Sequence, residues 1–133
     1  MKKLLPIFIA ALLLVGCAAP AEREVSYRQI TMDEAVAMME EENNYIILDV
    51  RTLAEFNEKH IPGAINIPNE TIGAEAIPEL PDKEQLILVY CRSGNRSKQA
   101  SEKLAALGYA NVVEFGGIID WPGETQSNEG GPL

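Results

Sequence analysis

The sequence predicts an α/β domain in which a parallel sheet is covered by helices on both faces. Short apolar, β-branched runs alternate with helical patterns along the chain, and this alternation is typical of a parallel sheet and its connecting helices. The two clearest strands, 45–50 and 86–90, consist of consecutive apolar residues apart from Asp49, as expected for strands buried on both faces. With 133 residues, the chain has room for one domain.

The charge balance argues against nucleic-acid binding. The chain carries 20 acidic and 11 basic residues, for a net charge of −9. Nucleic-acid binding draws on clustered lysine and arginine, whereas an acidic surface of this kind favours solubility. We therefore expect no nucleic-acid partner, and we expect the domain to be a monomer.

The first seventeen residues have the pattern of an export signal. Lys2 and Lys3 precede the apolar run 4–15, which is too short to span a bilayer because a span needs about 20 residues. The run ends Leu14-Val15-Gly16-Cys17, which resembles the lipobox of bacterial lipoproteins. We therefore expect a lipid on Cys17 and an exported domain anchored to the bacterial cell envelope, at a periplasmic or extracytoplasmic face. The alternative is an ordinary signal peptide with an incidental cysteine.

These patterns divide the chain into four parts. Residues 1–16 form the signal peptide, 17–28 a lipidated tether, 29–124 the folded domain and 125–133 a disordered tail. The tether lacks apolar periodicity, and the tail is rich in glycine, proline and polar residues. If Cys17 carries lipid, the domain's other cysteine, Cys91, has no partner for an internal disulfide.

A polar loop that begins at Cys91 separates strand 86–90 from a helix predicted over about 97–107. A helix that starts directly after a strand leaves the free N–H groups of its first turn facing the loop. The helix dipole, Arg92 and Arg96 add positive charge there, which favours the nucleophilic thiolate form of Cys91. A buried structural cysteine is the alternative, but it does not account for the two arginines.

The segment after the first strand holds three candidate supporting residues. Asp49 and Arg51 fall at the carboxyl end of strand 45–50, the edge where open α/β sheets place their sites. We expect Arg51 to pair with Glu55 and fix the turn, while Asp49 could support the Cys91 loop or be structural. His60 is the single histidine, so a Cys–His pair has to be considered.

The remaining elements follow from capping and turn signals. Capping boxes at Thr31 and Thr52 predict helices that run to about Glu42 and through Phe56. Further expected features are short strands at 64–67 and 111–115, a helix over 71–79 closed by Pro78 and Pro81, a C-terminal helix cap at Gly108, a close approach of Gly116-Gly117 to the Cys91 loop, and a core-covering Trp121.

Three stretches are similar to signatures of the rhodanese (sulfurtransferase) family. Cys91-Arg-Ser-Gly-Asn-Arg96 resembles the family's active-site loop. The stretch from Ile47-Leu-Asp49-Val-Arg51 through His60-Ile-Pro62-Gly63-Ala64 to Pro68 resembles its upstream signature, and Gly116-Gly117-Ile-Ile-Asp-Trp121 resembles its closing segment. Together they cover about 30–123. The resemblance implies a rhodanese-like fold with about five parallel strands, and a mainly structural turn role for His60.

The resemblance also implies sulfur transfer through a persulfide on Cys91. The sulfur would come from a small anionic donor such as thiosulfate and pass to a thiol or cyanide, with no metal or organic cofactor. The expected substrate-binding residues are Arg92, Ser93, Gly94, Asn95, Arg96 and Ser97. One alternative is a low-turnover persulfide carrier or sulfide-sensing module. Another is a cysteine-dependent phosphatase, although such enzymes place five residues between cysteine and arginine and this loop has four, 92–95.

Overall fold

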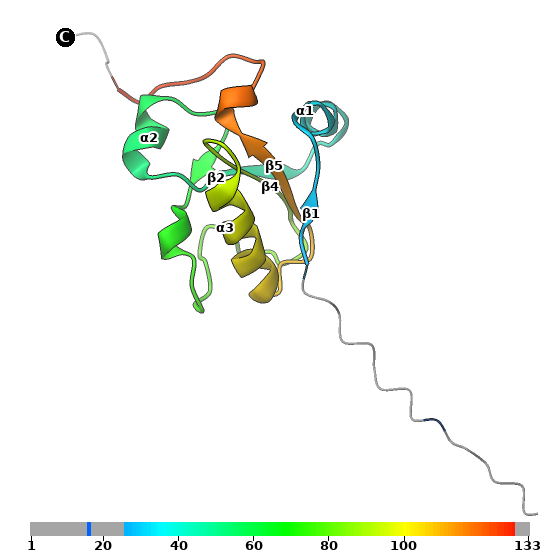
Figure 1. Cartoon of the computed structure of the whole chain (residues 1–133). Helices are drawn as coiled ribbons and strands as arrows, with labels where there is room; N and C mark the ends of the chain where they lie inside the picture. The colour runs from blue at the N-terminus through cyan, green and yellow to red at the C-terminus, as the bar shows by residue number, and fades with distance from the viewer. Residues whose placement is uncertain (1–15, 17–25, 130–133) are drawn as a thin grey trace, which may run out of the picture.

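The computed structural model describes residue 16 and residues 26–129 (Figure 1). The predicted signal peptide, apart from Gly16, and the predicted lipid attachment at Cys17 lie outside the described residues. Within the described part of the chain, no helix is both long and apolar enough to cross a membrane.

Five parallel strands form one sheet in the order β1-β5-β4-β2-β3. The strands are β1 (Arg28–Gln29), β2 (Tyr45–Asp49), β3 (Ile65–Asn66), β4 (Leu86–Cys91) and β5 (Val112–Gly117). The helices are α1 (Met32–Glu41), α2 (Leu53–Glu58) and α3 (Asn95–Ala106), with short 3₁₀ turns η1 (Asn69–Thr71) and η2 (Ile118–Asp120). This architecture confirms the predicted α/β fold with a five-stranded parallel sheet.

The sheet is buried on both faces, as the apolar runs predicted. Alternate residues of β4 contribute to two separate core clusters: Ile87 and Val89 pack with α3, while Leu88 and Tyr90 pack with α1 and α2. Figure 1 shows α3 and α1 on opposite sides of the strands. This alternation follows from the two-residue period of a strand, and it places Cys91, the last residue of β4, on the α3 side.

The helix boundaries follow the predicted capping residues. Thr31 Oγ1 accepts a hydrogen bond from Glu34 N at 3.2 Å, and Thr52 forms a reciprocal capping box with Glu55. Gly108, at a φ of +96°, follows α3 and supplies its predicted C-terminal cap. The N-terminus of α3 lies at Asn95 rather than about Ser97, because Gly94 adopts a left-handed conformation and turns the chain early.

The predicted helix over 71–79 is wrong. After η1 the chain continues as turns and coil to residue 85, with Ile72, Ile77 and Leu80 buried against the α3 side of the sheet. Gly73 and Pro78 both disfavour a helix interior. The three buried side chains anchor the segment to the core, and their irregular spacing fits neither a helix nor a strand.

Residues 125–129 differ from the disordered tail that we expected. His60 N donates to Gln126 O at 2.8 Å, Gln126 N donates back to His60 O at 2.9 Å, and Asn128 N donates to Asn57 O at 2.9 Å. The segment satisfies backbone groups that α2 leaves open where it ends. Residues 130–133 lie outside the described part.

Candidate active site

The site forms where β2, β4 and β5 end at the same edge of the sheet. The strand register places Asp49 beside Tyr90, and Cys91 beside Gly117. A register irregularity in β5 between the partners of Val89 and Cys91 shifts the last pair. Asp49, Cys91 and the end of β5 are therefore neighbours although up to 68 residues separate them in the sequence.

Cys91 ends β4, directly before the loop that leads into α3. Gly94 N donates to Cys91 Sγ at 2.9 Å, and the thiol donates to Ser97 Oγ at 3.3 Å. Gly94 makes this contact at a φ of +113°, a conformation that a side chain resists. The predicted placement of Cys91 before a helix N-terminus is confirmed, and its side chain is 1% exposed.

The end of β5 packs directly against this loop. A β-carbon on Gly117 would lie 1.9 Å from the carbonyl oxygen of Arg92, which is far inside van der Waals contact. Just beyond, Ile119 N donates to the same carbonyl oxygen at 3.3 Å. The predicted close approach of Gly116-Gly117 is confirmed, and Gly117 is the residue that permits it.

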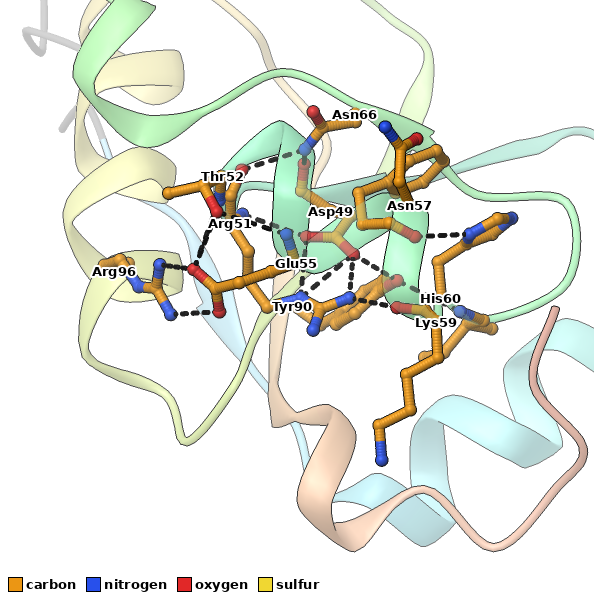
Figure 2. Close-up of polar contacts among 12 residues, drawn as sticks. Asp49, Arg51, Thr52, Glu55, Asn57, Lys59, His60, Asn66, Tyr90 and Arg96 are labelled. Carbon is orange, nitrogen blue, oxygen red and sulfur yellow. Dashed lines mark hydrogen bonds and ion pairs between the residues drawn. The ribbon is translucent and has the colours of Figure 1, made fainter. Parts of the chain in front are cut away.

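Arg96 pairs with Glu55, which corrects the prediction that Arg51 would do so. Two bonds of 2.6 and 3.0 Å join the guanidinium to the carboxylate (Figure 2). The hydrogen bond from Arg96 lowers the pKa of Glu55 to about 2, and the same bond raises the pKa of Arg96. The pair links α2 to α3 and neutralises one of the two loop arginines.

Arg51 instead pairs with Asp49 inside the domain. Arg51 Nη2 lies 2.7 Å from Asp49 Oδ2, and both side chains are buried. Tyr90 Oη donates to the same carboxylate at 2.7 Å (Figure 2). Burial, followed by the hydrogen bond to Asp49, raises the pKa of Tyr90. Asp49 therefore fixes the position of Tyr90, the residue before Cys91.

His60 forms part of the turn after α2. Its Nδ1 lies 2.8 Å from Phe56 O, and its ring stacks on Phe56 with the centroids 3.9 Å apart. Within the described part of the chain it makes no hydrogen bond with Cys91. These contacts agree with a structural turn histidine rather than with a Cys–His pair.

A cleft of about 380 Å³ opens beside the loop. Two of its lining residues, Arg51 and Glu55, belong to the ion pairs above. Three other charged lining residues form no ion pair among the described residues: Glu58, Lys59 and Arg92. Ile118 and Ile119 complete the wall. The sequence analysis missed Lys59, although it lies next to His60.

The sequence analysis also missed Glu114, which lies behind the loop on β5. Its side chain is 3% exposed, and its Oε1 accepts from Ser97 Oγ at 2.6 Å and from Gly116 N at 2.9 Å. A carboxylate within the otherwise apolar run Val112-Val113-Glu114-Phe115 was the available signal, since glutamate is rarely buried. No cluster of histidine, cysteine and acidic residues in the described part could hold a metal ion.

Comparison with known proteins identifies the family of the chain. Residues 31–123 match the rhodanese-like domain family, which is most of the chain. The chain belongs to the rhodanese-like domain family. Among related proteins, the thiosulfate sulfurtransferase PspE of Escherichia coli is 38% identical over 73 residues, which are 55% of this chain and 70% of that protein. A sulfurtransferase of Allochromatium vinosum is 40% identical over 57% of this chain and 70% of that protein.

Other rhodanese-family relatives are longer or have been solved as structures. The chain spans 57% of the putative sulfur carrier protein YrkF of Bacillus subtilis, at 29% identity over 80% of this chain. A rhodanese structure with anions from E. coli matches with a TM-score of 0.57 and 34% identity, covering 62% of this chain and 98% of that one. A rhodanese-like domain protein from Staphylococcus aureus matches with a TM-score of 0.63 and 32% identity, covering 75% and 97%.

Proposed function

We propose that this domain is a sulfurtransferase that carries a sulfane sulfur on Cys91. Its donor is a small anion such as thiosulfate, and its acceptor is a thiol or cyanide. Family membership and the relatives named as sulfurtransferases support sulfur transfer in general. The observation that carries the proposal is the position of Cys91 Sγ, which accepts a hydrogen bond from Gly94 N at the start of α3.

The chemistry needs only the cysteine and donors aimed at negative charge. Cys91 thiolate attacks the outer sulfur of thiosulfate: a new S–S bond forms on Sγ, the bond to the sulfonate sulfur breaks, and sulfite leaves with the electron pair. The acceptor thiolate or cyanide then attacks the outer sulfur and returns Cys91 as thiolate. Backbone N–H groups of Arg92 to Ser97 stabilise the persulfide charge, as preorganised donors do in other anion holes.

The charged residues of the cleft support different roles for the two loop arginines. Glu55 already engages Arg96 through two hydrogen bonds. Arg92 and Lys59 line the same cleft and form no ion pair among the described residues. We therefore assign attraction of the anionic donor mainly to Arg92 and Lys59, and to Arg96 the task of holding the loop.

Steady-state transfer from thiosulfate to cyanide tests the proposal. The wild-type protein should form thiocyanate, and Cys91→Ser should form none, because an alcohol neither ionises near neutral pH nor forms a persulfide. Lys59→Ala should raise the KM for thiosulfate, while Lys83→Ala, which changes a lysine outside the cleft, serves as the charge-matched control. Equal turnover by wild type and Cys91→Ser would overturn the nucleophile assignment.

A persulfide carrier with little turnover is the second candidate. It needs the same loop, and the likeness to the putative sulfur carrier YrkF favours it. The same assay separates the two, because a carrier accepts one sulfur from thiosulfate but releases thiocyanate slowly.

Phosphatase activity is a third outcome. The pairing of Arg96 with Glu55 argues against it, because a phosphoryl group would need that guanidinium.

We further propose that the domain is tethered to the cell envelope through a lipid on Cys17. The support is the Leu14-Val15-Gly16-Cys17 sequence after a short apolar run. Cells expressing the full chain should yield a detergent-phase protein, and Cys17→Ala should leave it unlipidated. Recovery of the wild-type protein in the aqueous phase, with a free Cys17 thiol, would contradict the tether.

A further inference from the structure

Glu114 is a buried carboxylate next to the reactive cysteine, and the transfer chemistry above does not use it. Its side chain is 3% exposed. No lysine or arginine of the described residues forms an ion pair with it. A buried charge without a counter-ion is costly, so its place between β5 and the Cys91 loop calls for a functional explanation.

Ser97 connects this carboxylate to Cys91. The serine hydroxyl has one hydrogen, and its shortest acceptor contact is Glu114 Oε1 at 2.6 Å, compared with 2.9 Å to Gly94 O. With the hydrogen directed to Glu114, Ser97 Oγ offers Cys91 a lone pair and accepts from the thiol at 3.3 Å. This arrangement stabilises the thiol, because a thiolate would lose Ser97 as a partner and keep only the Gly94 N–H.

The negative charge of Glu114 also favours the thiol form of Cys91 over the thiolate. One hydroxyl group separates the carboxylate from Sγ, and like charges at that distance repel strongly in a protein interior. Arg96 also interacts electrostatically with Cys91 and favours the thiolate, but Glu55 pairs with the guanidinium and reduces this effect. Glu114 also lines a cleft of about 440 Å³ whose other charged lining residues are Glu34 of α1, Lys98 of α3 and Asp120 of η2. Tyr27 and Gln29 approach Glu114 from β1 and the residues before it.

We propose that Glu114, acting through Ser97, is an electrostatic brake on Cys91. It favours the thiol form of the cysteine at rest, whereas the loop arginines and the helix dipole, taken alone, favour the thiolate. It also offsets part of the attraction that Arg92 and Lys59 exert on an anionic donor. The brake therefore slows sulfur loading from a dianion such as thiosulfate more than loading from an uncharged persulfide donor. It also slows oxidation, because the thiolate is the form that oxidises. The donor part of this inference rests on the proposed sulfur transfer, and the thiol part does not.

Glu114→Gln tests the brake through a gain of reactivity. The amide keeps an oxygen for Ser97 Oγ and Gly116 N but removes the charge. Iodoacetamide alkylation of the Cys91 peptide, followed by mass spectrometry at mildly acidic pH, should become about tenfold faster than in the wild type. The difference in alkylation rate between Glu114→Gln and the wild type should shrink at alkaline pH, where a cysteine thiol ionises in either protein. A variant that merely damaged the fold would not reproduce this pH-dependent gain, and a thermal melt of each protein checks the fold.

Asp120→Asn is the matched control, because Asp120 lines the same cleft, is exposed, and makes no hydrogen bond to Ser97 or Cys91. It should alkylate like the wild type. An unchanged or slower alkylation rate in Glu114→Gln would overturn the brake, as would an equal gain in Asp120→Asn.

The donor arm compares sulfur loading of Cys91 by thiosulfate and by an uncharged persulfide. Glu114→Gln should load faster from thiosulfate by a larger factor than from the neutral donor. If alkylation accelerates but neither donor loads Cys91, the proposed sulfur transfer fails while the brake on the thiol stands. If both donors load faster by the same factor, the donor-selection part is wrong.

Discussion

The two sides of the Cys91 loop differ in how their charges are balanced. On the α2 side two carboxylates each pair with a guanidinium, Asp49 with Arg51 and Glu55 with Arg96. On the β5 side Glu114 meets only a hydroxyl, a backbone N–H and, at 3.4 Å, the amide of Gln29. The two ion pairs on the α2 side fix the shape of the loop, and their electrostatic potentials nearly cancel at a distance. On the β5 side, Glu114 has no counter-ion, and its charge therefore acts on the reactivity of Cys91.

The largest expected effect comes from breaking the buried pair of the α2 side. Asp49→Ala leaves Arg51 charged and buried, and it removes the acceptor of Tyr90 Oη. We expect a loss of about 3–5 kcal/mol in the free energy of unfolding, measured by urea denaturation. Glu124→Ala, at an exposed position, is the control. A loss no larger than the control's would mean that the buried network is not a stabilising support of the loop.

A change on the β5 side tests the packing of strand and loop. Gly117→Ala places a β-carbon 1.9 Å from Arg92 O, so β5 and the loop must move apart. Overpacking of this kind costs about 1–3 kcal/mol and should also displace the N–H groups that face Cys91. Thiocyanate formation should fall together with the melting temperature. Gly73→Ala, where nothing lies near the new β-carbon, should leave activity unchanged. Full activity in Gly117→Ala would show that the close approach is dispensable.

The smallest effect concerns the half-exposed pair of Glu55 and Arg96, whose side chains are 30% and 29% exposed. Solvent screening limits its contribution to about 1 kcal/mol. The pKa of Glu55 is lowered in the folded state to about 2 from its ordinary value of 4.5. Its contribution is therefore present above pH 4.5 and lost as the pH falls towards 2.

Urea denaturation of wild type and Glu55→Gln measures this difference. The two proteins should differ most near neutral pH and converge in acid, below the pKa of the folded carboxylate. A difference that stayed constant down to the most acidic pH would show that the carboxylate charge of Glu55 is not what stabilises the loop.

Local signals in the sequence predicted the parts of this site that depend on neighbouring residues. The capping box at Thr52 and the cysteine before a helix start both act within a few positions. The pairing of Glu55 with Arg96 joins residues 41 positions apart, and short-range spacing favoured Arg51 instead. Arg51 pairs instead with Asp49, two positions away, whose buried carboxylate lies beside Tyr90 in the sheet.

The same limit explains the missed residues and the wrong helix. Ser97 and Glu114 meet only because β4 and β5 are neighbours in the sheet. In the segment 71–80, Gly73 and Pro78 leave little helix propensity. Burial of Ile72, Ile77 and Leu80 in the core decides the conformation instead.

The most direct test of the central claim is the mass of the Cys91 peptide after one exposure to thiosulfate. Cys91 should gain one sulfur atom, and cyanide should remove it and release thiocyanate in equal amount. Cys91→Ser treated in the same way should gain none. A wild-type Cys91 peptide of unchanged mass, with the added sulfur absent or found elsewhere in the protein, would contradict sulfur transfer through this loop.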